Sequence, residues 1–136
     1  MRTTIAIFAV LTAMLFATTI AFSHHSFAAE YDAAKPITIK GTITKIDLVN
    51  PHSWLYIDVK DSDGKVVNWA IEMGSPNNLI RRGVTKNSVP VGTEVTVDGY
   101  RAKDGSATVN GTTIKMPDGK RLFAGSSAPD APDGQK

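Results

Sequence analysis

The chain has 136 residues, with 15 lysines and arginines against 13 aspartates and glutamates, and it contains no cysteine. A formal net charge of +2 is too small to produce the strong positive field of a nucleic-acid-binding protein, so we expect no nucleic acid partner. The lack of cysteine excludes disulfides, thiol chemistry and cysteine-based metal sites. Any metal would have to be held by histidine, carboxylate, methionine or main-chain nitrogen.

The first 23 residues have the pattern of a secretory signal peptide. Arg2 supplies a positive charge, and the run IAIFAVLTAMLFATTIAF that follows carries none. Ala21 and Ser23 provide the small side chains that signal peptidase requires, which predicts cleavage directly after Ser23, with a later cut after Ala28 as the alternative. No basic stop-transfer patch follows the apolar run. We therefore expect an exported, periplasmic protein with no membrane anchor after cleavage.

Cleavage at this point would leave 113 residues, which is the size of one domain. We assign residues 24–125 to a single domain. Residues 126–136 are small, polar and rich in proline, so this tail is predicted to be disordered.

Alternation of apolar and polar residues predicts β-strands along most of the domain. The segment ITIKGTITKIDLV, from Ile37, alternates until Thr44, where the phase slips, and this indicates a long, bent strand with a bulge. The segments SWLYIDV and VVNWAIEM flank the turn DSDG and predict a hairpin, with Trp69 facing inward and Trp54 outward. VPVGTEVTVDGY and SATVNGTTIKMPDGKRLF predict further strands.

One short helix is expected in GSPNNLIRRG, where Ser75 can cap, Pro76 suits the first helical position and Gly83 can end the turn. Five or six strands with a helix between the third and the fourth are typical of a small Greek-key barrel of the oligonucleotide/oligosaccharide-binding (OB) kind. The predicted fold is therefore an all-β, OB-fold-like barrel, and a β-sandwich is the alternative.

The three histidines are the candidates for a metal site. Cleavage after Ser23 would make His24 the first residue, so that its amine and its imidazole could chelate one cation, and copper(II) is favoured by nitrogen donors. His25 adds a second imidazole, and His52, in NPHSW, could complete the site. The alternatives are that the pair is incidental to a flexible terminus and that His52 is a turn residue bonded to a loop carbonyl.

Two aromatic residues are the candidates for a different site. Trp54 and Tyr56 fall on the face of their strand opposite the apolar residues, and barrels of this kind stack bases or sugar rings on such side chains. The alternative is that the segment FAAEYD, with Phe27 and Tyr31, covers them.

The segments HHSFAAEYD, NPHSWLYIDV, NWAIEMGSPNNLIRRG and VTVDGYRAKDG resemble a family of small exported bacterial proteins, domain of unknown function 6152. In that family a histidine pair, here His24 and His25, typically follows the leader directly, and the Asn-Pro-His element corresponds to residues 50–52. The resemblance implies the earlier cut, although Ser23 stands where alanine is usual. It implies no activity.

These patterns together predict a non-enzymatic periplasmic protein that carries or senses copper or another divalent metal through His24, His25 and His52. The alternative is a metal-free module that binds a small molecule, a glycan or a periplasmic protein partner through Trp54 and Tyr56. A copper-dependent oxidase is the third hypothesis, and it has the least support because no substrate cleft can be identified in the sequence.

Overall fold

A computed structural model describes residues 26–125 and 131–132. The predicted signal peptide, His24, His25 and most of the predicted tail lie outside these described residues. The elements in chain order are α2 (Phe27–Glu30), β1 (Tyr31–Asp47), β2 (Trp54–Lys60), β3 (Val66–Glu72), α3 (Pro76–Arg81), β4 (Glu94–Ala102), β5 (Thr108–Lys115) and β6 (Arg121–Phe123).

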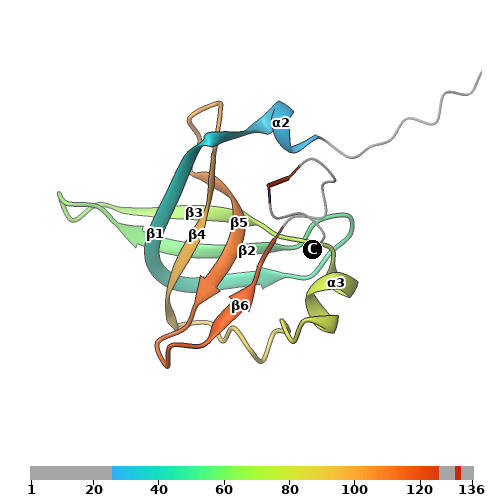
Figure 1. The fold of residues 1–136 in the computed structure, drawn as a ribbon. Coiled ribbons are helices and arrows are strands. Elements are labelled where there is room, and N and C mark those ends of the chain that lie inside the picture. Colours follow the sequence, from blue (N-terminus) through green and yellow to red (C-terminus); the bar gives the residue numbers. More distant parts are fainter. Residues whose placement is uncertain (1–25, 126–130, 133–136) are drawn as a thin grey trace, which may run out of the picture.

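Strands β1 to β5 form a closed barrel (Figure 1). β1 pairs antiparallel with both β2 and β4, β2 pairs with β3, and β4 pairs with β5. A short parallel pairing of Ala70–Glu72 with Thr108–Asn110 joins β3 to β5 and closes the ring. β6 extends the sheet beyond β5. With α3 between β3 and β4 in the chain, the predicted OB-like Greek-key barrel is confirmed.

The long first strand bends because it must pair on both sides. Its 17 residues pair with β4 along one half and with β2 along the other. The register against β2 shifts between Ile43 and Lys45, which is the position where the sequence alternation slips, so the predicted bulge is confirmed. Gly41 precedes Thr42, the residue that pairs with both strands, and a Cβ at Gly41 would lie 2.5 Å from the carbonyl oxygen of Asp58 on β2. Glycine is therefore required for this close approach.

The inward-facing residues of the strands fill one core inside the barrel. Leu55, Ile57, Ile71 and Val97 are each fully buried, and full burial of such a side chain stabilises the fold by about 1.5–3 kcal/mol. Trp69 packs against this core, as its predicted inward orientation requires. The helix α3 contributes a fully buried Leu79.

A second, smaller apolar cluster lies on the outer face of the barrel. It contains the buried Phe27 and Tyr31, with Tyr100, Ala102 and Ala131 packed against them. Phe27 is the first residue of α2, a single helical turn at one end of the barrel (Figure 1) that the sequence patterns did not predict. Within the described ranges, no helix has the length and the apolar character needed to cross a membrane.

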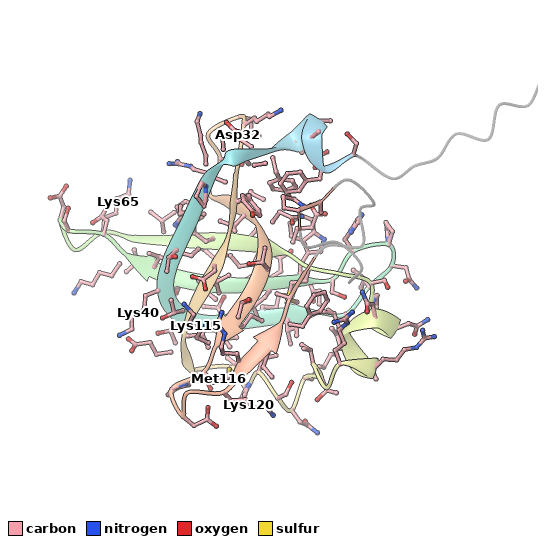
Figure 2. The ribbon with its side chains drawn as sticks, in the orientation of Figure 1. Asp32, Lys40, Lys65, Lys115, Met116 and Lys120 are labelled. Atoms are coloured by element: carbon pink, nitrogen blue, oxygen red, sulfur yellow. The ribbon has the colours of Figure 1, made fainter. Side chains whose placement is uncertain are left out.

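Lysine–carboxylate pairs hold neighbouring strands together on the surface. Nζ of Lys40 on β1 lies 2.7 Å from Oε1 of Glu94 on β4. Nζ of Lys115 on β5 lies 2.8 Å from Oδ2 of Asp98 on β4. Figure 2 shows Lys40 and Lys115 on the outside of the barrel, and Lys65 at the tip of the β2–β3 hairpin. These exposed pairs contribute little stability individually, about 0–1 kcal/mol.

Candidate functional site

The carboxylate of Glu72, the last residue of β3, is the centre of a buried polar cluster. Although Glu72 points away from the barrel core, it is only 7% exposed. The hydroxyl of Tyr31 donates a hydrogen bond of 2.5 Å to its Oε2 atom. Nδ1 of His52 lies 3.4 Å from its Oε1 atom. One carboxylate therefore contacts both the start of β1 and the loop that precedes β2.

The hairpin register explains why His52 lies beside Glu72. Trp54 stands directly opposite Glu72 in the β2–β3 pairing. The pairing continues past the end of β2, because the amide of Ser53 donates to the carbonyl of Gly74 and the carbonyl of Ser53 accepts from the amide of Met73. His52, two residues before Trp54, thus points to the same outer face and is the diagonal neighbour of Glu72.

Tyr31 provides the hydrogen bond that a buried carboxylate requires. Burial raises the pKa of the Tyr31 phenol well above its ordinary value, and the hydrogen bond to Glu72 and the negative charge of that carboxylate raise the pKa further. Tyr31 therefore stays protonated and remains a donor throughout the physiological pH range. Without such a donor, the buried carboxylate would carry a desolvation cost.

Asn110 extends the polar cluster onto β5. It is 2% exposed, and it stands in register with Glu72 across the β3–β5 pairing and with Tyr100 across the β4–β5 pairing. Its Nδ2 atom is buried and has no hydrogen-bond acceptor within the described part of the chain. A buried amide donor thus lies next to the strand that carries Glu72.

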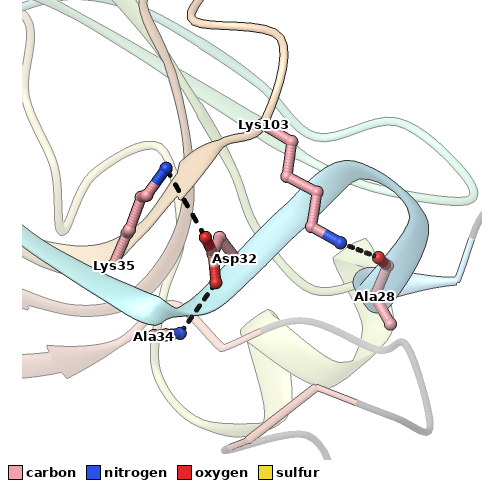
Figure 3. Close-up of polar contacts among 5 residues, drawn as sticks. All are labelled: Ala28, Asp32, Ala34, Lys35 and Lys103. Atoms are coloured by element: carbon pink, nitrogen blue, oxygen red, sulfur yellow. Dashed lines mark hydrogen bonds and ion pairs between the residues drawn. The ribbon is translucent and has the colours of Figure 1, made fainter.

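A pocket of about 550 Å³ opens beside this cluster. Its walls come from the last residues of α2, from Tyr31 and Trp54, and from the end of β4 with the β4–β5 turn. The turn is fastened to α2 by Lys103, whose ammonium group donates a hydrogen bond of 2.5 Å to the carbonyl oxygen of Ala28 (Figure 3). Asp32 lies nearby and accepts from the amide of Ala34.

The two aromatic residues predicted to form one surface have different surroundings. Trp54 is half-buried and lines the pocket, whereas Tyr56 is not among the lining residues. The Tyr56 ring instead lies 5.3 Å, from its centroid, from the ammonium nitrogen of Lys45. Tyr31, which the alternative interpretation placed over this face, lines the pocket together with Trp54.

The structure places only one of the three predicted metal ligands. His52 is in the loop before β2, while His24 and His25 lie outside the described residues. Among the residues that are described, no three His, Asp or Glu side chains come together as a metal site. The sequence patterns did not indicate Glu72 as a site residue. Its position opposite Trp54 could have been derived by counting back along both strands from the DSDG turn.

These features define the class of protein: a small, closed, five-stranded barrel of the OB kind with a buried polar cluster and a pocket on its outer face. The model of a family of unknown function, DUF6152, matches residues 13–112, and the chain belongs to this family. The resemblance seen in the sequence is thereby confirmed. Comparison with curated proteins and with solved structures gave no match.

Proposed function

We propose that this protein is an exported, non-enzymatic binding protein that holds copper or another divalent metal through His24, His25 and His52. The observation that supports the proposal is the double contact of Glu72, which lies 3.4 Å from Nδ1 of His52 and is hydrogen-bonded to Tyr31. One carboxylate thus connects the distant histidine with the segment that follows the histidine pair.

A carboxylate beside Nδ1 is the usual companion of a metal-binding imidazole. Such a partner fixes the orientation of the ring and its tautomer, and it makes the other ring nitrogen a better ligand. His52 is nearly buried, with a side chain 11% exposed, so its ring has little orientational freedom. Nε2 of His52 is therefore the atom that would bind the metal.

The N-terminal donors would be tethered close to the barrel. Signal peptide cleavage after Ser23 would place the amine on His24, two residues before Ser26. Ser26 caps α2 through a hydrogen bond of 3.2 Å to the amide of Ala29, and Phe27 is buried. Since an extended chain spans at most about 3.6 Å per residue, the Cα atom of His24, which carries the amine and the imidazole, would remain within about 7 Å of the Cα atom of Ser26.

The chemistry of this donor set favours copper(II). The amine and imidazole of His24 would supply two nitrogen atoms, and the imidazole of His25 or His52 would supply another. Copper(II) binds nitrogen donors in a square-planar arrangement more strongly than other common divalent metals do. A site of this kind would serve the carriage or sensing of copper in the periplasm.

The test is native mass spectrometry of protein purified from the periplasm of a host grown with trace copper and zinc. It reports the first residue and the bound metal in one measurement. A mass that begins at His24 and includes one metal ion supports the proposal. A metal-free mass that begins at Ala29 contradicts it, because both N-terminal histidines would then be lost with the leader.

Copper titrations of three variants test the individual donors. One extra residue before His24 moves the amine out of the chelate, so we expect at least about a tenfold loss of affinity, and His52→Ala should have a similar effect. Asp118→Asn, in the remote β5–β6 turn, is the control and should bind like the wild type. Unchanged affinity in both ligand variants contradicts the proposal. Oxygen consumption by the reduced copper protein above that of free copper would instead favour an oxidase.

A further inference from the structure

We infer that the pocket next to Trp54 is a binding site for a neutral sugar ring, independent of any metal. The pocket has a volume of about 550 Å³, within the usual range for small-ligand sites. Within the described ranges, neither His52 nor Glu72 lines it. The proposed ligand would therefore bind whether or not a metal is present.

Small side chains create the hollow. Ala29 on α2 and Ala102 at the end of β4 line it, and neither side chain extends beyond Cβ. A larger residue at position 29 or 102 would reduce the volume beside the Trp54 ring.

The lining combines an aromatic ring with hydrogen-bond acceptors. The half-buried Trp54 offers a flat apolar surface of the kind on which sugar rings stack in barrels of this class. Glu30 and Asp104 supply carboxylates, and Ser106 and Thr108 supply hydroxyls. Sugar hydroxyls are good donors to carboxylates, and a hydrogen bond to a charged group is stronger than one between neutral groups.

The charge of the lining argues against an anionic ligand such as a nucleotide. Among the described residues that line the pocket, Lys103 is the single cation, against the two carboxylates of Glu30 and Asp104. The ammonium group of Lys103 already donates to the carbonyl of Ala28. The pKa of Asp104 is held below its usual value, mainly by the hydrogen bond from the amide of Ser106, so this carboxylate stays ionised. A phosphate would meet net negative charge.

The polar wall is held in place before any ligand binds. The amide of Lys103 donates to the carbonyl of Glu30 at 2.8 Å, and this bond joins the β4–β5 turn to α2. Within the turn, the amide of Ser106 donates to Asp104 at 2.9 Å, and the hydroxyls of Ser106 and Thr108 are 3.0 Å apart. Because this wall is already ordered, binding loses less conformational entropy.

The experiment uses the Trp69→Phe variant as the starting protein. The chain has two tryptophans, so this change leaves Trp54 as the sole source of indole fluorescence. With EDTA present to remove metal, the protein is titrated with maltotriose, cellotriose and chitotriose, and with AMP as the anionic probe. We expect at least one neutral sugar to shift the Trp54 emission with a dissociation constant of about 1 mM or below.

Two variants test the location of the site. Ala29→Leu, in the same background, places a larger side chain in the pocket from an exposed helical position and should weaken sugar binding at least about tenfold with an unchanged melting temperature. Trp54→Ala, in the wild-type background and followed by saturation-transfer NMR, should abolish binding, whereas Trp54→Phe should retain part of it. If Trp54→Ala does not fold, the Ala29→Leu result decides.

Three results would overturn the inference. The first is that none of the three sugars binds at about 10 mM, well above the expected dissociation constant. The second is that the affinity for sugar is the same in the Ala29→Leu variant. The third is that AMP binds more tightly than every sugar, which would assign the pocket to nucleotides. None of these results bears on the metal proposal, since the titrations exclude metal.

Discussion

Tyr31 and Glu72 are 41 residues apart in the chain, and a hydrogen bond of 2.5 Å joins the phenol of one to the carboxylate of the other. Tyr31 begins β1 and Glu72 ends β3, so the bond fastens the N-terminal segment to the outer face of the barrel. Both residues are less than 10% exposed. The contact therefore couples the stability of this segment to the polar cluster that also includes His52.

Removal of the Tyr31 hydroxyl should destabilise the protein. In Tyr31→Phe the ring still packs against Phe27, but the buried Glu72 carboxylate loses a donor, and we expect a loss of about 1–3 kcal/mol in urea denaturation. Tyr100→Phe is the matched control. The hydroxyl of Tyr100 makes no hydrogen bond within the described residues, so its loss should change the stability by less than about 0.5 kcal/mol. Equal effects would contradict a specific role for the Tyr31–Glu72 bond.

The same tyrosine predicts a loss of stability at alkaline pH. Burial and the bond to Glu72 raise the folded-state pKa of Tyr31 above the ordinary value of 10.0. Above pH 10 the unfolded chain loses this proton while the folded protein keeps it, so the unfolded state is favoured as the pH rises. The free energy of unfolding of the wild type should fall between pH 10 and pH 12, and that of Tyr31→Phe should fall less. Parallel curves would contradict the assignment to Tyr31.

The barrel could be predicted because local patterns determine most of it. The alternation of Leu55 and Ile57 identifies a strand with one buried face, and the phase slip after Thr44 locates the bulge of β1. Turn residues locate the hairpins, since Gly64 and Gly105 both adopt the positive φ that these turns require. None of these features depends on residues far away in the chain.

The polar cluster could not be predicted in this way. Alternation assigns Glu72 to the outer face of its strand, where a carboxylate is ordinarily exposed. Glu72 is buried because residues 26–31 cover this face, and that covering depends on the docking of Phe27 against Tyr100. The sequence pattern identified His52 as a candidate ligand, but only the hairpin register shows that it stands beside a carboxylate.

Asp98 should stabilise the protein above acidic pH. On β4 it accepts a hydrogen bond from Thr38 on β1 and pairs with Lys115 on β5. Burial opposes ionisation, but the hydrogen bonds from Lys115 and Thr38 outweigh it and lower the pKa of Asp98. A carboxylate with a lowered pKa stabilises the folded state above its unfolded-state pKa, and this contribution is lost as the pH falls.

The substitution Asp98→Asn tests this contribution. Because the site is partly exposed, we expect a loss of about 1 kcal/mol near neutral pH. The difference between the variant and the wild type should shrink as the pH falls below about 4, the unperturbed value for aspartate. Urea denaturation at a series of pH values checks this. A difference that does not depend on pH would show that Asp98 acts through packing and not through its charge.

Gly99 is required where β4 passes close to β5. A Cβ at this position would collide with the carbonyl oxygen of Asn110 and would lie 2.5 Å from a side-chain carbon of Val109. Since one obstacle is the backbone of a neighbouring strand, relaxation is limited, and Gly99→Ala should cost about 3 kcal/mol. It should also displace Asn110, which borders the polar cluster at Glu72.

The control for this change is Gly119→Ala, in the β5–β6 turn. Gly119 has a φ of +85°, and no atom lies within 4 Å of the position that a Cβ would take. Alanine there would have only the cost of the left-handed conformation, about 1–2 kcal/mol. Thermal unfolding should therefore show a larger loss for Gly99→Ala than for Gly119→Ala. If the two losses are equal, β4 and β5 pack less tightly at Gly99 than these distances indicate.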